Sequence, residues 1–439
     1  MNQPVELQSF YPIEAGGFTG GHPLRWISYR MMVWSLLGLV IVLAGSLLVT
    51  VSLAHHIQQY FSFAREHFGL LLAVASTYSF AVVIIEKTSR FPGWSSITVV
   101  LPAVTSAFLL LVCILLIGRY YYARSFLVTA YTLSFLWLAA GMHLRRRYLI
   151  PRIAIIAEGA AAGLANVRGV HWQVLVKPSP MNHAIDGVVV DLHARLSDHW
   201  LRFVADCALH RIPVYHSGWV YESVTGRTSV SQMSETFMHS LEPPAVYVLA
   251  KRILDLAVVL ALLPVVAPLM GLLAVAIKFD SAGPVLFRQP RVGQGGQAFQ
   301  ILKFRSMYQQ PANQSARFAE HADSRVTRVG AVMRKWRLDE LPQFWNILRG
   351  HMSLVGPRPE QVYFVREFEA RIPFYAYRHT VKPGITGWAQ VTHGYTADVE
   401  STTEKLERDM YYIRHMSFWL DFSILIRTLR ILITGFGAR

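Results

Sequence analysis

Four apolar stretches in the first third of the chain constrain its fold more than any other feature. They occupy residues 31–54, 69–85, 97–117 and 126–142. Each is close to the roughly 20 residues that an α-helix needs to cross the hydrocarbon core of a bilayer. The whole chain, with 53% hydrophobic and 16% charged residues, is also more apolar than an ordinary soluble protein. Residues 1–150 are therefore predicted to form a four-helix transmembrane bundle, in preference to the buried helices of a large soluble protein.

Basic residues are distributed unevenly around these stretches. They gather at three flanks, as Arg25 and Arg30, Lys87 and Arg90, and Arg145, Arg146, Arg147 and Arg152. The two intervening loops carry only Arg65, and Arg119 with Arg124. Since cytoplasmic loops are enriched in Lys and Arg, both ends of the bundle are expected in the cytoplasm. The first 24 residues show no apolar core of a cleavable signal peptide.

Residues 151–245 have a different pattern, in which short apolar runs alternate with helix-like stretches. The runs lie at residues 153–156, 173–176, 187–190 and 213–215, and residues 198–210 form the clearest helical stretch. Such alternation is typical of a small parallel α/β domain. The segment Glu242-Pro243-Pro244 is expected to be its exit linker.

This α/β domain is predicted to be a degenerate relative of the dinucleotide-binding fold. After its first strand, residues 158–163 read EGAAAG and lack the GxGxxG fingerprint. Glu158 also places a negative charge where a pyrophosphate would approach. Dinucleotide binding is therefore not expected, and a regulatory or scaffolding role is favoured.

A fifth apolar segment lies at residues 253–277, between Lys251-Arg252 and Lys278. At this length a membrane span is the default prediction. However, Pro264 and Pro268 each remove a helical N–H in the middle of the segment, which favours a sharp bend. Basic residues at both ends give no reason to send them to opposite sides of the membrane. We therefore predict a re-entrant helix over residues 251–278, which keeps the remainder of the chain in the cytoplasm.

The C-terminal half is rich in cations that stand beside Gly or Pro. The net charge of +15 already indicates a polyanionic partner. Because Pro fixes the backbone and Gly allows close approach, cations in such turns can be held rigidly against a ligand. The runs are RQPRVG at 288–293, KFRSM at 303–307, DSRVTR at 323–328, GPRP at 356–359 and KPGITGW at 382–388. Together they predict a polyphosphate pocket.

Asp339-Glu340 is the acidic pair that these runs surround. It follows the cations Arg334, Lys335 and Arg337. Nearby cations are expected to lower a carboxyl pKa, and an ionised carboxylate beside a phosphate site can act as a nucleophile or hold a divalent cation. Taken alone, the pair is more typical of a helix start near Pro342, with acids in the first turn, and it is the surrounding cations that favour a site.

Several other site classes are excluded by their missing patterns. The chain has no GxxxxGK[ST] loop, no HExxH, no CxxC pair and no DxD. Its two cysteines, Cys113 and Cys207, give no disulfide framework. Nucleic-acid binding is disfavoured because the basic residues alternate with apolar sequence and no recognised binding motif is present. Residues 411–434 mix aromatic, aliphatic and basic residues, so a core helix and an interfacial amphipathic helix both remain open.

The motifs of residues 247–439, in their order, resemble one family: the large monotopic phosphoglycosyl transferases, bacterial polyprenyl-phosphate hexose-1-phosphate transferases that initiate exopolysaccharide or O-antigen synthesis. The resemblance rests on Lys251-Arg252 with Asp255, KFRSM at 303–307, LDELP at 338–342, MSLVGPRP at 352–359 and KPGITGW at 382–388. It implies an α-rich monotopic catalytic domain over residues 246–439. The bundle and the Rossmann-like domain match the family's large form by architecture only.

The resemblance also implies a reaction at the inner face of the bacterial cytoplasmic membrane. Asp339 would attack the sugar-bearing phosphorus of a UDP-hexose, with glucose or galactose as the sugar, and release UMP. Undecaprenyl phosphate would then take the phosphosugar, while Glu340 would hold Mg²⁺. Donor or phosphate binding would fall to the residues of the surrounding motifs: Arg291, Lys303, Arg305, Arg334, Arg358, Lys382 and, as a further family acid, Asp409.

One position departs from the family pattern. Relatives often carry Ser-Pro at the re-entrant bend, whereas this chain has Ala267-Pro268 and an additional Pro264. The competing interpretation of the whole chain is a non-catalytic membrane scaffold of a polysaccharide assembly complex, in which Asp339-Glu340 only caps a helix. The sequence leaves the oligomeric state open, and a homo-oligomer is compatible with it.

Overall fold

The computed structural model describes residues 25–53, 68–89, 96–120, 122–148, 152–167, 171–178, 187–210, 212–230, 243–308, 325–392 and 399–434. Within it the chain forms two compact units, residues 1–226 and 227–439. Some sequence predictions fall outside the described residues, namely those on residues 1–24, Arg65, Arg90, Glu242 and Asp323-Ser324.

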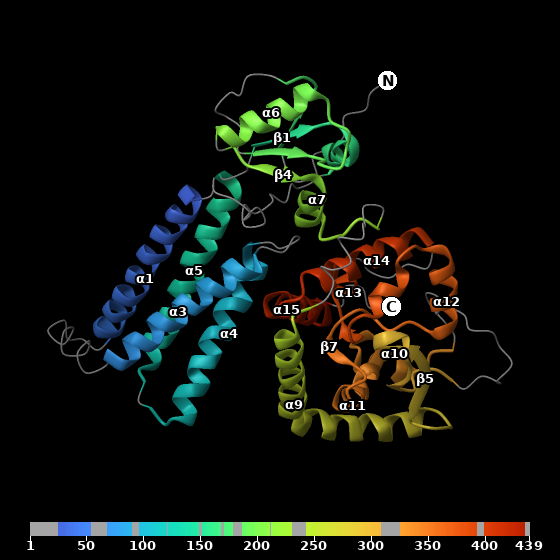
Figure 1. Ribbon diagram of the computed structural model, residues 1–439. Coiled ribbons are helices and arrows are strands. Elements are labelled where there is room, and N and C mark those ends of the chain that lie inside the picture. Colours follow the sequence, from blue (N-terminus) through green and yellow to red (C-terminus); the bar gives the residue numbers. More distant parts are fainter. Residues whose placement is uncertain are drawn as a thin grey trace, which may run out of the picture. The chain divides into compact units, whose positions relative to one another are not determined.

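The first unit opens with the predicted bundle of apolar helices (Figure 1). These are α1 (Arg25–Leu53), α3 (Phe68–Thr88), α4 (Ser96–Ile117) and α5 (Arg124–Tyr148). All of them are long and apolar enough to cross a membrane. Trp34 of α1 stacks on Trp137 of α5, with ring centroids 4.4 Å apart. Gly38 and Gly141 make room for this pair, because a Cβ at either position would stand 2.3 Å from a tryptophan ring atom.

A parallel sheet in the order β2-β1-β3-β4 follows the bundle in sequence. Its strands are β1 (Arg152–Ile156), β2 (His171–Leu175), β3 (Gly187–Val190) and β4 (Val214–His216). In register, Ile153 pairs with Trp172 of β2 and with Gly187 of β3. The prediction of a small parallel α/β domain is confirmed, and so is its helix, which appears as α6 (Asp198–Leu209).

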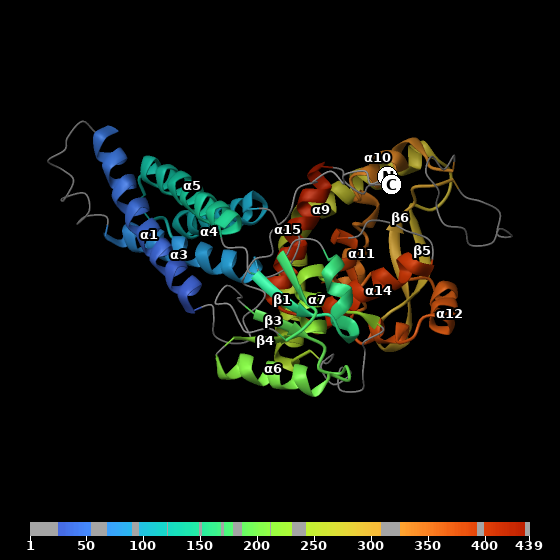
Figure 2. The ribbon, with the colours of Figure 1, turned by 90° about the horizontal axis from the view of Figure 1, so that it is seen from above.

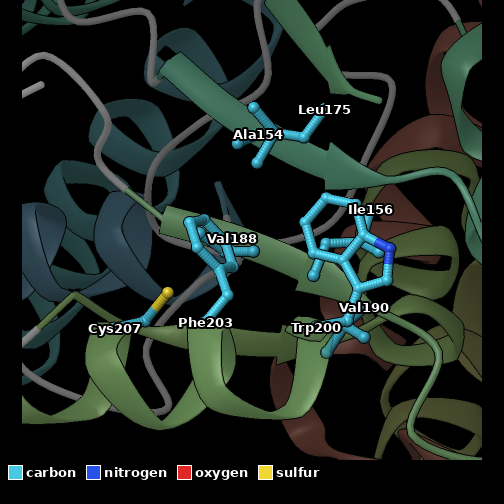
Figure 3. Packing of buried hydrophobic residues seen from close by; sticks show 8 residues of the cluster. All are labelled: Ala154, Ile156, Leu175, Val188, Val190, Trp200, Phe203 and Cys207. Carbon is cyan, nitrogen blue, oxygen red and sulfur yellow. The ribbon is translucent and has the colours of Figure 1, made fainter. Parts of the chain in front are cut away.

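Helices cover both faces of this sheet. The helix α6 lies along one face (Figures 1 and 2), where Trp200, Phe203 and Cys207 pack on Val188 and Val190 (Figure 3). The one-residue alternation of the strands turns their other side chains to the opposite face. There they pack against η3 (Gly159–Asn166) and α7 (Ser217–Thr225).

The turn that would hold a phosphate in a dinucleotide-binding domain is filled by a carboxylate of the chain itself. Asp191, which follows β3, accepts hydrogen bonds from the backbone N–H of Ala160 (2.8 Å) and of His193 (3.0 Å). Burial would raise the pKa of Asp191, but these bonds and the nearby His216 and His193 hold it below its usual value. The backbone N–H of Ala160, in the turn after β1, is thus already bonded within the protein, and the expectation that the domain binds no dinucleotide stays a prediction.

The long helix α9 (Ala245–Asp280) lies in the second unit and contains Pro264 and Pro268. Figure 1 shows α9 as two arms that meet at a sharp bend. The segment stays helical through both prolines, so the expected interruption takes the form of a bend rather than a gap in the helix. Residues of the second arm, among them Ile277, pack against Phe304 and Met333.

The basic pair before the apolar run of α9 makes contacts within the protein. Lys251 is buried and its Nζ lies 2.6 Å from Asp421 Oδ2. Arg252 donates to the carbonyls of Ile347 (2.6 Å) and Leu348 (3.0 Å), at the C-terminus of a short helix. Its charge therefore complements a helix end. The assignment of Lys251 and Arg252 to the re-entrant segment stays a prediction, and the structure adds these contacts within the protein.

The remaining elements build an α-rich core around two small sheets. The hairpin of β5 (Leu286–Val292) and β6 (Ala298–Phe304) is antiparallel, turns at η5 (Gln294–Gly296), and runs beside α12 (Figure 2). The short strands β7 (Ser353–Val355) and β8 (Gly384–Thr386) pair in parallel. The other elements are α10 (Arg328–Lys335), η6 (Leu338–Glu340), α11 (Gln343–Leu348), α12 (Val362–Arg371), η7 (Tyr375–His379), α13 (Trp388–Thr392), α14 (Val399–Arg414) and α15 (Phe418–Thr434).

Helix α15 and the residues just after the α/β domain both pack against the rest of the second unit. The helix α15 buries Leu420, Ser423 and Ile424 on one face, whereas Phe418 and Leu429 are exposed, so the two predictions for residues 411–434 both stay open. Residues after the α/β domain dock on α14, where Thr228 N–H donates to the carbonyl of Glu407 (3.0 Å).

The bend of α9 predicts that both of its ends lie on the same side of a membrane. Val246 and Phe279 flank the segment and are 82% and 89% exposed, so cysteines there are accessible to label. In a background with both native cysteines replaced by Ser, we expect Val246→Cys and Phe279→Cys to react with an impermeant maleimide only in inside-out vesicles. Tyr120→Cys, in the loop after α4 and 64% exposed, serves as the control that reacts in intact cells. Labelling of Phe279→Cys from outside would instead establish a span.

Candidate active site

The acidic pair lies in η6, a single tight turn between α10 and α11. Arg337, the residue before the η6 turn, has a φ of 53° in the left-handed region, and this redirects the chain as it leaves α10. Leu338 and Leu341 pack with Met333 and Ile277 of the second α9 arm. Because the two leucines face the core, the turn that carries the acids is fixed directly on the apolar helix.

Glu340 is buried and forms the centre of the site. Its Oε1 accepts hydrogen bonds from Lys303 Nζ at 3.3 Å and from Arg358 Nη2 at 3.0 Å. Lys303 comes from β6 and Arg358 from the loop after β7. Burial alone would raise the pKa of Glu340, but Arg358, Lys303 and Arg337 lower it well below its usual range. Glu340 is therefore ionised at any physiological pH.

The second carboxyl oxygen of Glu340 is the atom that best fits a cation. Oε2 is buried and has no hydrogen-bond partner among the described residues. Among the residues that the structure describes, no group of three or more His, Cys, Asp or Glu side chains is arranged so that it could hold a metal ion. Mg²⁺, however, is commonly held by one or two carboxylates together with substrate phosphates and water. The donor set at Glu340 fits an ion held in that way.

Asp339 is half-buried and has the opposite electrostatic balance. Burial and the neighbouring Glu340 raise its pKa, and Lys303, Arg358 and Arg334 only partly oppose this. The expectation that the surrounding cations would lower the pKa of Asp339 is wrong, while the same expectation holds for Glu340. Two adjacent carboxyl groups are thus driven in opposite directions, a pattern typical of groups with different chemical roles.

Lys303, Arg334 and Arg358 are the predicted binding residues that act on the acidic pair. Arg334, in the last turn of α10, does so through its charge on Asp339. Two others lie at the ends of α9. Arg305 is buried and its Nη2 donates to the carbonyl of Ser281 (2.6 Å), and the charge of Lys382 interacts with Arg252 and Asp255.

Arg291 and Asp409 lie around the loop that carries Arg358. Arg291 Nη1 donates to the carbonyl of Pro359 at 3.1 Å. Asp409 is fully buried and its Oδ2 accepts from Arg378 Nη2 at 2.8 Å. These contacts give both residues a task within the protein, and substrate contact by either stays a prediction.

Glycines in two of the predicted motifs approach each other rather than a ligand. A Cβ on Gly356 would stand 2.4 Å from the carbonyl oxygen of Lys382, and one on Gly384 would stand 2.1 Å from the backbone nitrogen of Gly356. The pairing of β7 with β8 brings these backbones together. The backbones of the motifs GPRP and KPGITG therefore pack directly against each other. Arg358 follows this close contact in the chain.

Sequence reasoning missed Arg378, Glu360 and Lys405. Arg378 is buried beneath the Arg358 loop, and Glu360 pairs with Lys405 of α14. Burial would raise the pKa of Glu360, but Lys405, Arg378 and Arg291 lower it to about 2. The available signal was the position of Glu360 directly after the GPRP run. A carboxylate in a buried loop needs a cationic partner, so this position could have predicted an ion pair.

Comparison with known proteins gives one family model that matches residues 246–435, described as bacterial sugar transferase. The chain is 45% identical over 358 residues to a UDP-N-acetylgalactosamine-undecaprenyl-phosphate N-acetylgalactosaminephosphotransferase of Aeromonas hydrophila, covering 81% of this chain and 85% of the relative.

Glucose-transferring relatives match a shorter part of the chain. A UDP-glucose:undecaprenyl-phosphate glucose-1-phosphate transferase of Caulobacter vibrioides is 46% identical, over 42% of this chain and 70% of the relative. One with the same name from Escherichia coli is 42% identical, over 41% of this chain and 39% of the relative.

The raised pKa of Asp339 generates a prediction about pH. If Asp339 reacts as a carboxylate, its reaction with the donor is lost as the pH falls through a pKa above the usual 3.8. Arg334 lowers this pKa, so the pKa should be higher in Arg334→Met. In a plot of covalent labelling by the donor against pH, the acid limb should then move to higher pH. Lys335→Met, which removes a neighbouring exposed cation, is the matched control and should leave the limb in place. Equal shifts in both variants would show that only net charge matters.

Proposed function

The chain belongs to the bacterial sugar transferase family, and we propose that it works through a covalent intermediate on Asp339. The overall reaction is transfer of a sugar 1-phosphate from a UDP-sugar to undecaprenyl phosphate. The observation that supports our proposal best is the pair of carboxyl groups with opposed pKa shifts in one turn on the apolar helix α9.

In the first step a carboxylate oxygen of Asp339 attacks the sugar-bearing phosphorus of the donor. The bond between that phosphorus and the bridging oxygen breaks, and the electron pair leaves with UMP. In the second step a phosphate oxygen of undecaprenyl phosphate attacks the same phosphorus. The bond to Asp339 breaks, which restores the carboxylate and yields a lipid diphosphate sugar. Splitting one displacement into two easier ones is the advantage of covalent catalysis.

The surrounding cations suit a diphosphate donor. Lys303 and Arg358 already neutralise Glu340, and Arg334 adds positive charge near Asp339. Preorganised positive groups at a transferring phosphoryl group stabilise the charge of its transition state. Glu340 would hold Mg²⁺ through Oε2, and the ion would supply further neutralisation of the diphosphate.

Exposed aromatic residues support a site at the inner surface of the bacterial cytoplasmic membrane. Trp336 and Trp345 bracket the acidic pair in sequence and are 46% and 50% exposed. Lys335 lies over the ring of Trp336 and Arg349 over that of Trp345, at 5.9 and 5.2 Å from the centroids. Tryptophan beside Lys or Arg is typical of the boundary between lipid and water. The acceptor phosphate would meet Asp339 at this depth.

A second candidate function, a non-catalytic scaffold, makes a different prediction for Asp339. In our mechanism Asp339→Asn removes the nucleophile without changing size, so it should abolish UMP release and the mass gain of the peptide that carries residue 339. Intact-protein and peptide mass spectrometry after incubation with donor alone measures both. Asp198→Asn, at an exposed position of α6, is the control. Full activity of Asp339→Asn would refute the nucleophile assignment.

The sugar is the finer part of the proposal. We propose N-acetylgalactosamine, because the relative that matches 81% of this chain carries that sugar in its name, whereas the glucose relatives match only 41–42% of it. With equal concentrations of donors, UDP-N-acetylgalactosamine should release UMP at least about tenfold faster than UDP-glucose or UDP-galactose, the discrimination expected when a site binds a polar substituent. A faster reaction with UDP-glucose or UDP-galactose would contradict this proposal and identify a simple hexose as the transferred sugar.

A further inference from the structure

The carbonyl groups of the loop that carries Arg358 hold its main chain in place. Residues 357–360 read Pro-Arg-Pro-Glu, and the two prolines have no N–H to donate. Each of the four carbonyls accepts a hydrogen bond. Their donors are the backbone N–H of Gly384 (2.9 Å), Arg378 Nη2 (2.9 Å), Arg291 Nη1 (3.1 Å) and the backbone N–H of Val292 (3.0 Å).

Among these donors, Arg378 contacts the residue that matters for the site. Its Nη2 bridges the carbonyl of Arg358 and Oδ2 of Asp409, while its Nη1 donates to the hydroxyl of Tyr375 at 2.6 Å. Both members of the Arg378–Asp409 pair are almost completely buried. A guanidinium with three partners in fixed directions has little freedom to move. The main chain of Arg358 is therefore held at one place relative to α14.

Helix α14 supports the loop at a second point. Lys405 and Asp409 are four residues apart and so lie on the same face of this helix. Lys405 pairs with the carboxylate of Glu360, which Arg291 also approaches at 3.8 Å. One helix face thus holds the loop both at Arg358 and two residues later. The guanidinium of Arg358 then extends from the far side of the loop to Glu340.

We propose that Arg378 and Asp409 are positioning residues for the transfer. Through the carbonyl of Arg358 they place its guanidinium against Glu340 and toward the position of the donor diphosphate. Neither residue needs to touch the substrate for this role. The proposal rests on the proposed function for its kinetic consequence, but its structural consequence, a rigid Arg358 loop, does not depend on turnover.

The kinetic test is a double-mutant cycle with Arg358. Arg378→Lys keeps the charge but loses the bridge, and Asp409→Asn keeps the shape but loses the ion pair. We expect either change to lower the rate of UMP release about 100-fold, the loss typical of a displaced catalytic group. In an Arg358→Gln background the same changes should have almost no further effect, because their target is already gone. Arg408→Lys, a buried arginine that pairs with Glu404 on the same helix, is the matched control.

A second measurement applies whether or not the protein turns over. Hydrogen exchange of the full-length protein reports the amides of Val292 and Gly384, which donate to the loop. Arg378→Lys and Asp409→Asn should each speed exchange at both amides at least tenfold, with Arg408→Lys unchanged. The same loss of rate in both Arg358 backgrounds, or unchanged exchange at these amides, would overturn the proposal. Absence of UMP release from the wild type with every UDP-sugar would overturn the proposed function, and the exchange result would still decide the positioning role.

Discussion

The ionised carboxylate of Glu340, buried between Lys303 and Arg358, is the interaction on which the catalytic unit depends. A charge removed from water is costly unless it is paired and hydrogen-bonded. Here the two partners come from a β-hairpin and from a loop that follows a separate strand. Both elements must therefore reach their places before Glu340 can be buried. Once they do, the same arrangement leaves positive charge around Asp339 next to it.

The apolar helix α9 places this charged centre at the edge of the unit. Its second arm packs under the turn of Asp339, and its first arm is tied to the core by Lys251, Arg252 and Asp255. Asp255 accepts a hydrogen bond from Ser353 at 2.6 Å, at the start of the strand that leads to Arg358. The helix that would enter the lipid is thus joined to the loop that carries Arg358 through strand β7. Depth in the membrane and geometry of the site are set together.

Periodicity and local motifs predicted much of this architecture. The apolar stretches became helices, and the short strands and α6 appeared close to their expected positions, because hydrophobic pattern and turn residues act over a few residues. The acidic pair was found for the same reason. The ion pair of Lys251 was not predicted because its partner, Asp421, lies 170 residues away. The direction of the Asp339 pKa shift was wrongly predicted. Burial outweighs the cations there, and the local sequence does not show how deeply a side chain is buried.

The two carboxyl groups show why burial has to be known residue by residue. Asp339 and Glu340 share one turn and largely the same cations, yet one pKa rises and the other falls. The difference is that Glu340 receives direct hydrogen bonds from Lys303 and Arg358, whereas Asp339 feels the same charges without those bonds and beside a negative neighbour. In the proposed mechanism this division suits Glu340 to holding positive charge. It leaves Asp339 with the more basic carboxylate of the two, which suits the proposed role of nucleophile.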